Sequence, residues 1–443
     1  MAIKPTRNGI VIHQRDSRRE RVSHPLDNGD IFRGGERNQA AQARVKANVE
    51  LSFNLRDVAV DAFIHIFNRG RQRYIVNVHP PGDSLPAWWP DVPLPSLRPL
   101  ARPFFMGFTN WPYDATVEAV FDTYDKIQTD GDIVAHHFQG GVPWTEAEVN
   151  GAYHSAVDDE INTRLALTDR VSNIYLAVDS LNGARDGLSG YWAASENLPL
   201  PGSWAGFDFS NPRVIEAYSN FANDVIGRFQ PRYFNYGTEV SELILNDSSK
   251  FDEFVTFATQ VYANIKAVHP DVELMVSVAV KSPGSAEMNA IRGRLGALSD
   301  AIDMLGISIY PYAFFGEAER GDPAMMTADW LSQVTVLMPG KPLAITETGW
   351  VGEPLTIPEF GLVVDGSQAH QSTYLEMLFK ASNALDMAFI IWFSVVDYDA
   401  LWSGPLGGDP VGAIWKDTGL YDESGVARTG LSTWRDWLRV PLQ

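Results

Sequence analysis

Two glutamates in this chain of 443 residues each stand where a short apolar run ends. Glu239 closes the run Tyr236-Gly-Thr-Glu239, and Glu347 lies within Ile345-Thr-Glu-Thr-Gly-Trp350. If both runs are strands of one parallel barrel, both carboxylates reach the rim where such barrels build their active sites. One carboxyl group could then protonate a glycosidic oxygen while the other attacks the sugar or stabilises its cation. The pair therefore predicts cleavage of a glycosidic bond.

The elements that must position these glutamates are eight short apolar runs that alternate with amphipathic, helix-like stretches. The expected strands are Phe104–Phe108, Ile133–His137, Asn173–Val178, Tyr233–Tyr236, Leu274–Val280, Met304–Ile309, Leu343–Thr346 and Phe389–Phe393. The clearest expected helices are Thr116–Gln128, Pro212–Phe229, Phe251–Val268 and Gln368–Asn383. Because every parallel return needs a crossover, this order predicts an α/β fold, a closed (β/α)8 TIM barrel. An open doubly wound sheet is the alternative, but it would favour a Gly-rich phosphate loop, which Met106–Trp111 is not.

The first hundred residues have a different character from the barrel. Residues 1–47 form a polar, basic segment that we expect to be a tail, with ten Lys or Arg against five Asp or Glu in residues 1–46. Residues 48–103 predict a small β-rich extension and a Pro-rich linker, since strand-like alternation from Val49 to Leu55 and at Tyr74–Val78 precedes eight prolines. The barrel is then expected over residues 104–443.

Composition narrows the classes of function. The net charge of −20 disfavours nucleic acid and other polyanions as partners, so a neutral substrate is expected. The chain has no Cys, which excludes a disulfide framework, a thiolate metal site and a cysteine nucleophile. Neither a signal-peptide run at the N-terminus nor a membrane-spanning run is apparent, so we expect a soluble protein with no membrane partner. The sequence fixes neither the compartment nor the oligomeric state.

Two motifs make the chain resemble a known group of enzymes. Leu305-Gly-Ile-Ser-Ile-Tyr-Pro-Tyr312, followed by Ile345–Trp350, is similar to strands six and seven of the retaining glycosidases of glycoside hydrolase clan A. The likeness is greatest to the endo-β-1,4-galactanase family. The stretch Gly419–Gly425, before a Trp-containing helix, resembles the closing stretch of that clan. The resemblance covers roughly residues 104–438.

The resemblance implies a role for each matching residue. Glu347 would be the nucleophile, Glu239 the acid/base, and Tyr310 the tyrosine that hydrogen-bonds the nucleophile. Trp392 would lie under the sugar next to the cleaved bond. For these roles we expect a raised pKa on Glu239 and an ionised Glu347. The clan usually has Asn immediately before its acid/base, where it contacts the sugar 2-hydroxyl, whereas this chain has the shorter Thr238.

Several other side chains at expected strand ends are candidates for binding a sugar, each with a structural alternative. His136 and His137 are adjacent on a strand and point to opposite faces, so they cannot hold one metal ion; one is expected to face the lumen and the other to pack. Asp179 could hold a hydroxyl or cap backbone, and Trp144 could stack on a sugar or pack. Trp350 flanks Glu347. Glu242 is a rival to Glu239 as the acid.

The lead hypothesis is a retaining β-glycosidase that acts on an oligo- or polysaccharide and needs no cofactor or metal. The main alternative is a barrel that binds glycans without cleaving them, because Thr238 replaces the usual Asn. A metal-dependent hydrolase that uses the histidines is a third alternative. The residues do not identify the sugar, the linkage, or an endo or exo mode.

Overall fold

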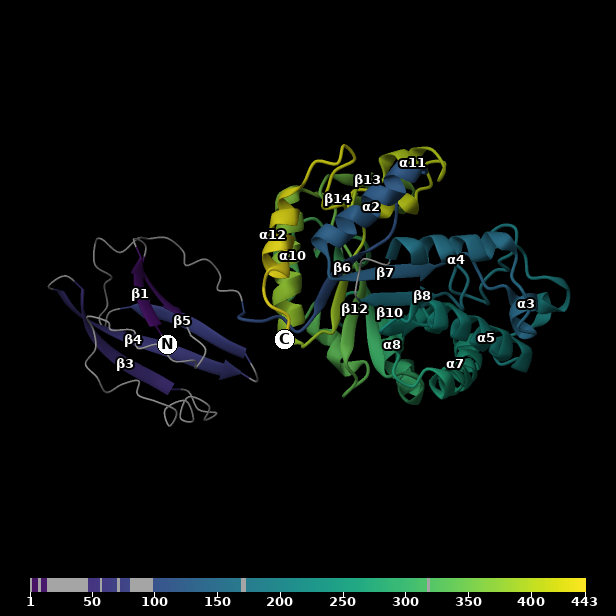
Figure 1. The fold of residues 1–443 in the computed structure, drawn as a ribbon, viewed down its shortest axis with the longest axis horizontal. Coiled ribbons are helices and arrows are strands. Elements are labelled where there is room, and N and C mark those ends of the chain that lie inside the picture. The colour runs from purple at the N-terminus through teal and green to yellow at the C-terminus, as the bar shows by residue number, and fades with distance from the viewer. Residues whose placement is uncertain are drawn as a thin grey trace. The chain divides into compact units, whose positions relative to one another are not determined.

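The computed structural model describes the side chains of residues 99–168, 173–316 and 319–443, and the backbone of five strands within residues 2–79. It divides into two compact units, Met1–Arg102 with Gln443, and Pro103–Leu442. Figure 1 shows both units as ribbons. The first unit is made of strands, and the second contains the barrel.

The first unit holds two antiparallel sheets. Strands β3 (Ala47–Leu55), β4 (Val58–Arg69) and β5 (Gln72–His79) form a three-stranded sheet in that order. Two of these strands match the runs expected from alternation, and β4 was not expected. Strands β1 (Ala2–Thr6) and β2 (Gly9–His13) pair within the segment that we expected to be a tail. The Pro-rich linker lies largely outside the described residues.

The second unit confirms the predicted fold class: eight parallel strands close into a barrel, and the open sheet is wrong. In chain order, the strands are β6 (Phe105–Thr109), β7 (Ile133–Phe138), β8 (Ile174–Val178), β9 (Tyr233–Asn235), β10 (Glu273–Ala279), β11 (Met304–Ile309), β12 (Leu343–Thr348) and β15 (Phe389–Trp392). All eight expected strands are therefore present. Their bounds differ by at most a few residues from the expected ones.

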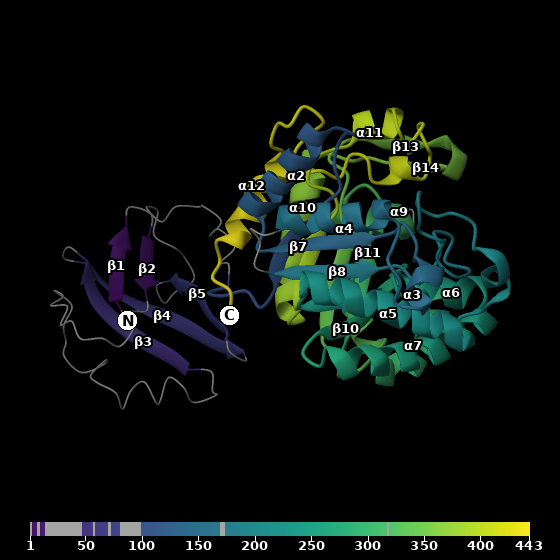
Figure 2. The same cartoon turned by 45° about the vertical axis from the view of Figure 1, so that its right-hand side comes forward.

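Helices of the barrel unit follow the strands and cover the outside of the barrel (Figures 1 and 2). They are α2 (Val117–Asp130), α3 (Trp144–Glu148), α4 (Ser155–Thr168), α5 (Pro212–Phe229), α6 (Val240–Asn246), α7 (Ser248–Val268), α8 (Ala286–Arg294), α9 (Pro311–Phe314), α10 (Gln368–Ala384), α11 (Asp399–Ser403) and α12 (Thr429–Leu438). A small hairpin, β13 (Leu355–Ile357) and β14 (Leu362–Val364), follows β12. Both views show this hairpin near α11, so the insertions after β12 and β15 lie at the same end of the barrel.

Strand alternation divides the core into two layers. Side chains that point into the barrel form a small cluster in which the Phe389 ring lies 5.0 Å from that of Tyr175 and 4.7 Å from that of Tyr233. The alternate residues join the larger layer between strands and helices, as Phe234 and Tyr236 do. Inside the barrel, Asn235 donates to the Tyr175 hydroxyl at 2.9 Å. Asn235 thus faces inward while its two aromatic neighbours face the helices, which is the period-two alternation of a strand.

Helix α5 begins as its sequence predicts. The Asn211 side chain accepts a hydrogen bond from the Arg213 backbone N–H at 3.0 Å, and Pro212 occupies the first helical position. We expect Asn211→Ala to lower the free energy of unfolding by about 1 kcal/mol, since the cap is lost. Urea unfolding would measure this change. Asn211→Asp keeps a capping oxygen and should unfold like the parent; an equal loss in both variants would contradict a capping role.

Candidate active site

A β-bulge turns Glu347 toward the mouth of the barrel. Ala344 points into the lumen, and simple alternation would send Glu347 to the opposite face. In the pairing of β11 with β12, however, Ile307 lies opposite Ile345, and Ser308 lies opposite Glu347, which leaves Thr346 as the extra residue. A bulge of this kind re-aims the side chains that follow it. Glu347 therefore reaches the rim on the inner side.

Glu239 lies in the short segment between β9 and α6, as the N-cap residue of α6, in the left-handed backbone region with φ 55°. Its backbone N–H donates to the Ser277 hydroxyl at 3.0 Å. The Ser308 hydroxyl donates to its carboxylate oxygen Oε1 at 2.8 Å. Because Ser308 is also the strand partner of Glu347, this hydrogen bond brings the two glutamates to one place on the rim.

Glu347 is held by the tyrosine that the resemblance pointed to. The Tyr310 hydroxyl donates to Glu347 Oε1 at 2.5 Å. Burial and the negative charge of Glu239 raise the pKa of Glu347 to about 7, whereas Tyr310, His137 and Arg185 lower it. We expected Glu347 to be ionised, and its pKa is instead raised to about 7.

A second polar network adjoins Glu239. His137 Nε2 lies 2.8 Å from Asp179 Oδ1, and the Gln139 amide donates to His137 Nδ1 at 2.8 Å, so His137 donates to Asp179. Thr238 Oγ1 lies 3.4 Å from the same Nε2. Burial alone would raise the pKa of Asp179, but Arg185 and His137 hold it well below its usual range. The expected residues His137, Asp179 and Thr238 therefore lie together.

Arg185 completes this network, and the sequence analysis missed it. One guanidinium nitrogen, Nη1, donates to Asp179 Oδ2 at 3.0 Å, and Nε lies 3.7 Å from Glu239 Oε2. Arg185 comes from the long loop after β8, in the left-handed backbone region with φ 55°. No periodicity or motif marks it. The one available signal was its position, a few residues beyond a candidate at a strand end.

Four aromatic or histidine candidates lie in packing layers instead of the mouth. His136 is fully buried, and its ring nitrogens contact Asn110 and Thr168 at 3.3 and 2.7 Å, which makes it the packing histidine. Trp144 is also fully buried and stacks on Trp204, so it offers no face to a sugar. Trp350 packs against Tyr374 in the layer between strands and helices.

Trp392 is the fourth misplaced candidate, and strand alternation explains the error. Phe389 and Ile391 belong to the lumen cluster, so Trp392 points outward, where its indole N–H donates to the Thr418 carbonyl at 2.8 Å. The next residue, Phe393, falls on the inner side and is partly exposed. Its ring lies 5.9 Å from that of Trp111, at the end of β6. Phe393 and Trp111, not Trp392, are the aromatic side chains available at this part of the mouth.

The rival acid, Glu242, lies on α6 and forms an ion pair with Lys281 at 2.8 Å. It is thus held by a lysine of the loop after β10, whereas Glu239 contacts Ser308 beside Glu347. Among the described residues, Glu239 is the better placed partner for Glu347.

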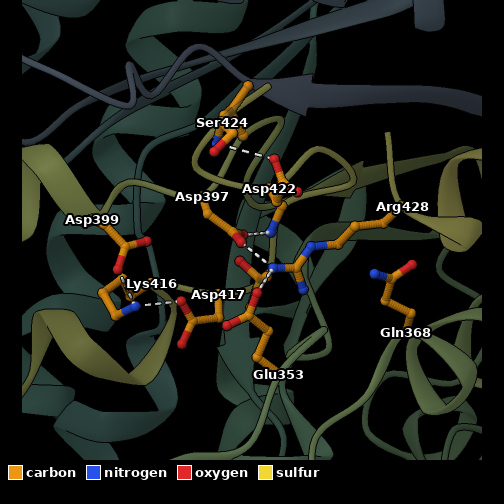
Figure 3. Close-up of polar contacts among 12 residues, drawn as sticks. Glu353, Gln368, Asp397, Asp399, Lys416, Asp417, Asp422, Ser424 and Arg428 are labelled. Atoms are coloured by element: carbon orange, nitrogen blue, oxygen red, sulfur yellow. Dashed lines mark hydrogen bonds and ion pairs between the residues drawn. The ribbon is translucent and has the colours of Figure 1, made fainter. Parts of the chain in front are cut away.

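A second charged cluster links the insertions after β12 and β15 (Figure 3). The buried Arg428 guanidinium contacts Asp397 and also Glu353, at 2.6 Å, while Lys416 lies between Asp399 and Asp417. Oxygens of Glu353, Asp397 and Glu423 are near enough to share a cation. The Arg428 guanidinium already pairs with two of these carboxylates, Glu353 and Asp397. We therefore interpret the cluster as an internal ion-pair network that connects the loop after β12 with the loop after β15.

No protein-family model and no curated protein matches the chain, but solved structures share its fold. An exo-β-1,4-mannosidase, Op5Man5 from Opitutaceae bacterium strain TAV5, superposes with a TM-score of 0.55 at 16% identity; the match covers 77% of this chain and 60% of the mannosidase. The chain thus spans less than two thirds of that enzyme. The GH53 catalytic domain of Ignisphaera aggregans gives 0.49 at 15% identity, over 80% and 99% of the two chains. Xylanase 10B from Thermotoga maritima gives 0.49 at 13% identity, over 76% and 94%.

These neighbours are enzymes of glycoside hydrolase clan A. With the mannosidase, at 16% identity, the likeness shows the fold alone, a (β/α)8 barrel. The particular likeness to galactanases is not shown. In the part of the chain that the structure describes, no helix has the length and apolar character needed to span a membrane.

The raised pKa of Glu347 predicts a pH-dependent effect on stability. The native state holds this proton up to a pKa of about 7, against 4.5 ordinarily, so the contribution of Glu347 to stability is complete below pH 4.5 and is lost as the pH rises through 7. Glu347→Gln removes the ionisation. We therefore expect it to raise the melting temperature more at pH 8 than at pH 5. Calorimetry of both proteins measures this; a gain that does not grow with pH would contradict the assignment.

Proposed function

We propose that the chain is a retaining β-glycosidase, with Glu347 as nucleophile and Glu239 as acid/base. The observation that carries the proposal is the pairing of two carboxylates at one rim: Tyr310 donates to Glu347, and Ser308, the strand partner of Glu347, donates to Glu239. Carboxylates from two strands at the C-terminal face of a barrel suit glycoside cleavage. The clan A enzymes with this fold support the same class of reaction.

In the first step, a Glu347 oxygen attacks the anomeric carbon while the bond to the leaving oxygen breaks. Glu239 gives its proton to that oxygen, and a glycosyl ester forms on Glu347. In the second step, ionised Glu239 takes a proton from water, the water oxygen attacks the anomeric carbon, and the ester bond to Glu347 breaks. The product keeps its β configuration, and both glutamates return to their starting states.

The mechanism requires one proton on the pair, located on Glu239. Burial and the negative charge of Glu239 raise the pKa of Glu347 to about 7, so the site holds a proton up to near neutral pH. The hydrogen bond from Tyr310 favours the ionised form of Glu347 and so favours the proton on Glu239. The rate of hydrolysis is therefore expected to fall at both low and high pH.

The charges around the pair favour a neutral sugar. Asp179, Glu239 and Glu347 bring three carboxyl groups to the site, and Arg185 already contacts two of them. An anionic sugar would add negative charge to this region. The substrate class we propose is thus a neutral β-linked oligo- or polysaccharide.

Two substitutions separate the roles of the glutamates. Glu347→Gln should abolish turnover of every substrate, because no nucleophile remains. Glu239→Gln should slow poor leaving groups far more than p-nitrophenyl glycosides, whose departure needs little proton transfer. Steady-state kinetics on both substrate types measures the difference. An equal loss on both would show that Glu239 is not the acid.

A glycan-binding barrel without activity is the second candidate, and Thr238 is the observation that favours it. Assays of binding and of hydrolysis on the same set of glycans distinguish the two candidates. Binding of β-glucan, galactan or mannan in calorimetry, with no release of reducing sugar from any of them, would support the binding protein and contradict the glycosidase.

A further inference from the structure

With Thr238 in place of the usual Asn, the hydrogen bond to the sugar 2-hydroxyl lacks its usual donor. In a retaining glycosidase, hydrogen bonds to the 2-hydroxyl strengthen in the transition state and supply several kcal/mol. Thr238 Oγ1 lies 3.4 Å from His137 Nε2, and this hydroxyl also interacts with the Asp179 carboxylate. The Thr238 hydroxyl is thus directed toward His137 and Asp179. Another donor must serve the 2-hydroxyl if this site is to be efficient.

Arg185 is the nearest group that could supply that donor. Its guanidinium reaches both neighbours of Thr238: Nη1 donates to Asp179 at 3.0 Å, and Nε lies 3.7 Å from Glu239. A distance of 3.7 Å is too long for a hydrogen bond. Arg185 Nε is buried and has no hydrogen-bond partner among the described residues. A buried N–H without an acceptor is costly, and its position beside the acid predicts that a ligand supplies one.

The Arg185 side chain is already oriented for this task. Nη1 also donates to the Asn182 carbonyl at 3.1 Å, and the backbone carbonyls of Ala184 and Arg185 accept from the Asn246 side chain at 3.3 and 3.5 Å. Asp179, in turn, is fixed by His137. A guanidinium held through Nη1 keeps its Nε–H in a defined direction, because the group is planar. Little entropy is then lost when the sugar binds.

We propose that Arg185 binds the 2-hydroxyl of the sugar next to the cleaved bond, in place of the asparagine that Thr238 replaces. The inference rests on the proposed glycosidase function. Arg185 Nε–H donates to the 2-hydroxyl oxygen, and this contact tightens as positive charge develops at the anomeric carbon. Because its donor is charged, the hydrogen bond is stronger than one from an amide. Arg185 makes the site selective for sugars with a free 2-hydroxyl.

The test pairs a change in the protein with a change in the substrate. Wild type is assayed on p-nitrophenyl β-D-glucoside, galactoside, mannoside and xyloside, and the one cleaved fastest is compared with its 2-deoxy analogue. We expect Arg185→Met to lower kcat/KM on the 2-hydroxyl substrate by roughly 10- to 100-fold, as for loss of a hydrogen bond from a charged donor. On the 2-deoxy substrate the loss should be clearly smaller, because only the support that Arg185 gives to Asp179 and Glu239 is lost there. The ratio of the two values within one preparation does not depend on how much of the protein is folded.

Arg228→Met is the matched control. Arg228 also forms ion pairs with two carboxylates, Asp158 at 2.8 Å and Asp224 at 3.0 Å. It lies away from the mouth, at the end of α5 that leads into β9. It should leave the substrate ratio unchanged. If Arg185→Met does not fold, Arg185→Lys is used, which keeps the charge beside Asp179 but lacks the Nε–H, and it should reduce the same ratio.

Two outcomes overturn the proposal, and they differ. If Arg185→Met slows both substrates equally, Arg185 only supports Asp179 and Glu239, and the glycosidase function stands. If wild type cleaves none of the four glycosides or the polysaccharides named above, the proposed function itself fails, and the assignment of Arg185 fails with it.

Discussion

Electrostatic repulsion between two carboxyl groups is the constraint around which the mouth of this barrel is organised. In the proposed mechanism Glu239 and Glu347 must lie together, and burial makes two neighbouring negative charges unfavourable. The surrounding residues offset that cost with donors: Tyr310 on Glu347, Ser308 on Glu239, and Arg185 beside Glu239. The pKa of Glu347 stays raised in spite of these donors, first because the carboxyl group is buried and second because Glu239 is close.

The barrel supplies this arrangement through local departures from regular structure. Glu347 reaches the mouth because a bulge at Thr346 shifts the register between β11 and β12. Glu239 and Arg185 both adopt left-handed backbone conformations, which side-chain-bearing residues rarely take. Strand β11 positions Ser308, and Tyr310 follows directly after that strand as the first residue before α9. The irregular positions bring the charged groups to these two hydroxyls. Such irregular backbone is typical of binding and catalytic sites.

The strands could be predicted because period-two alternation and strand-to-helix order are local properties of the sequence. The two glutamates could be placed near strand ends, but the bulge that turns Glu347 inward could not be predicted. The same alternation places Asn235 inside the barrel and Tyr236 outside. The role of Trp392 was taken from the resemblance and is wrong, because alternation along β15 places Phe389 and Ile391 in the lumen and Trp392 in the helix layer. His136 and His137 could be separated into opposite faces, but only the packed structure says which faces inward. Arg185 could not be predicted, since it comes from an irregular loop whose path depends on tertiary contacts.

The central claim is that Glu347 is the nucleophile of a retaining enzyme. Incubation with 2,4-dinitrophenyl 2-deoxy-2-fluoro-β-glycosides of glucose, galactose and mannose should slow the second step and leave the sugar attached, because the fluorine destabilises the positively charged transition state. Mass spectrometry of the digested protein then locates the sugar. The account predicts one fluorosugar on the peptide that contains Glu347. Attachment to Glu239 or to another residue, or turnover of an active β-glycoside with inversion of the product, would contradict it.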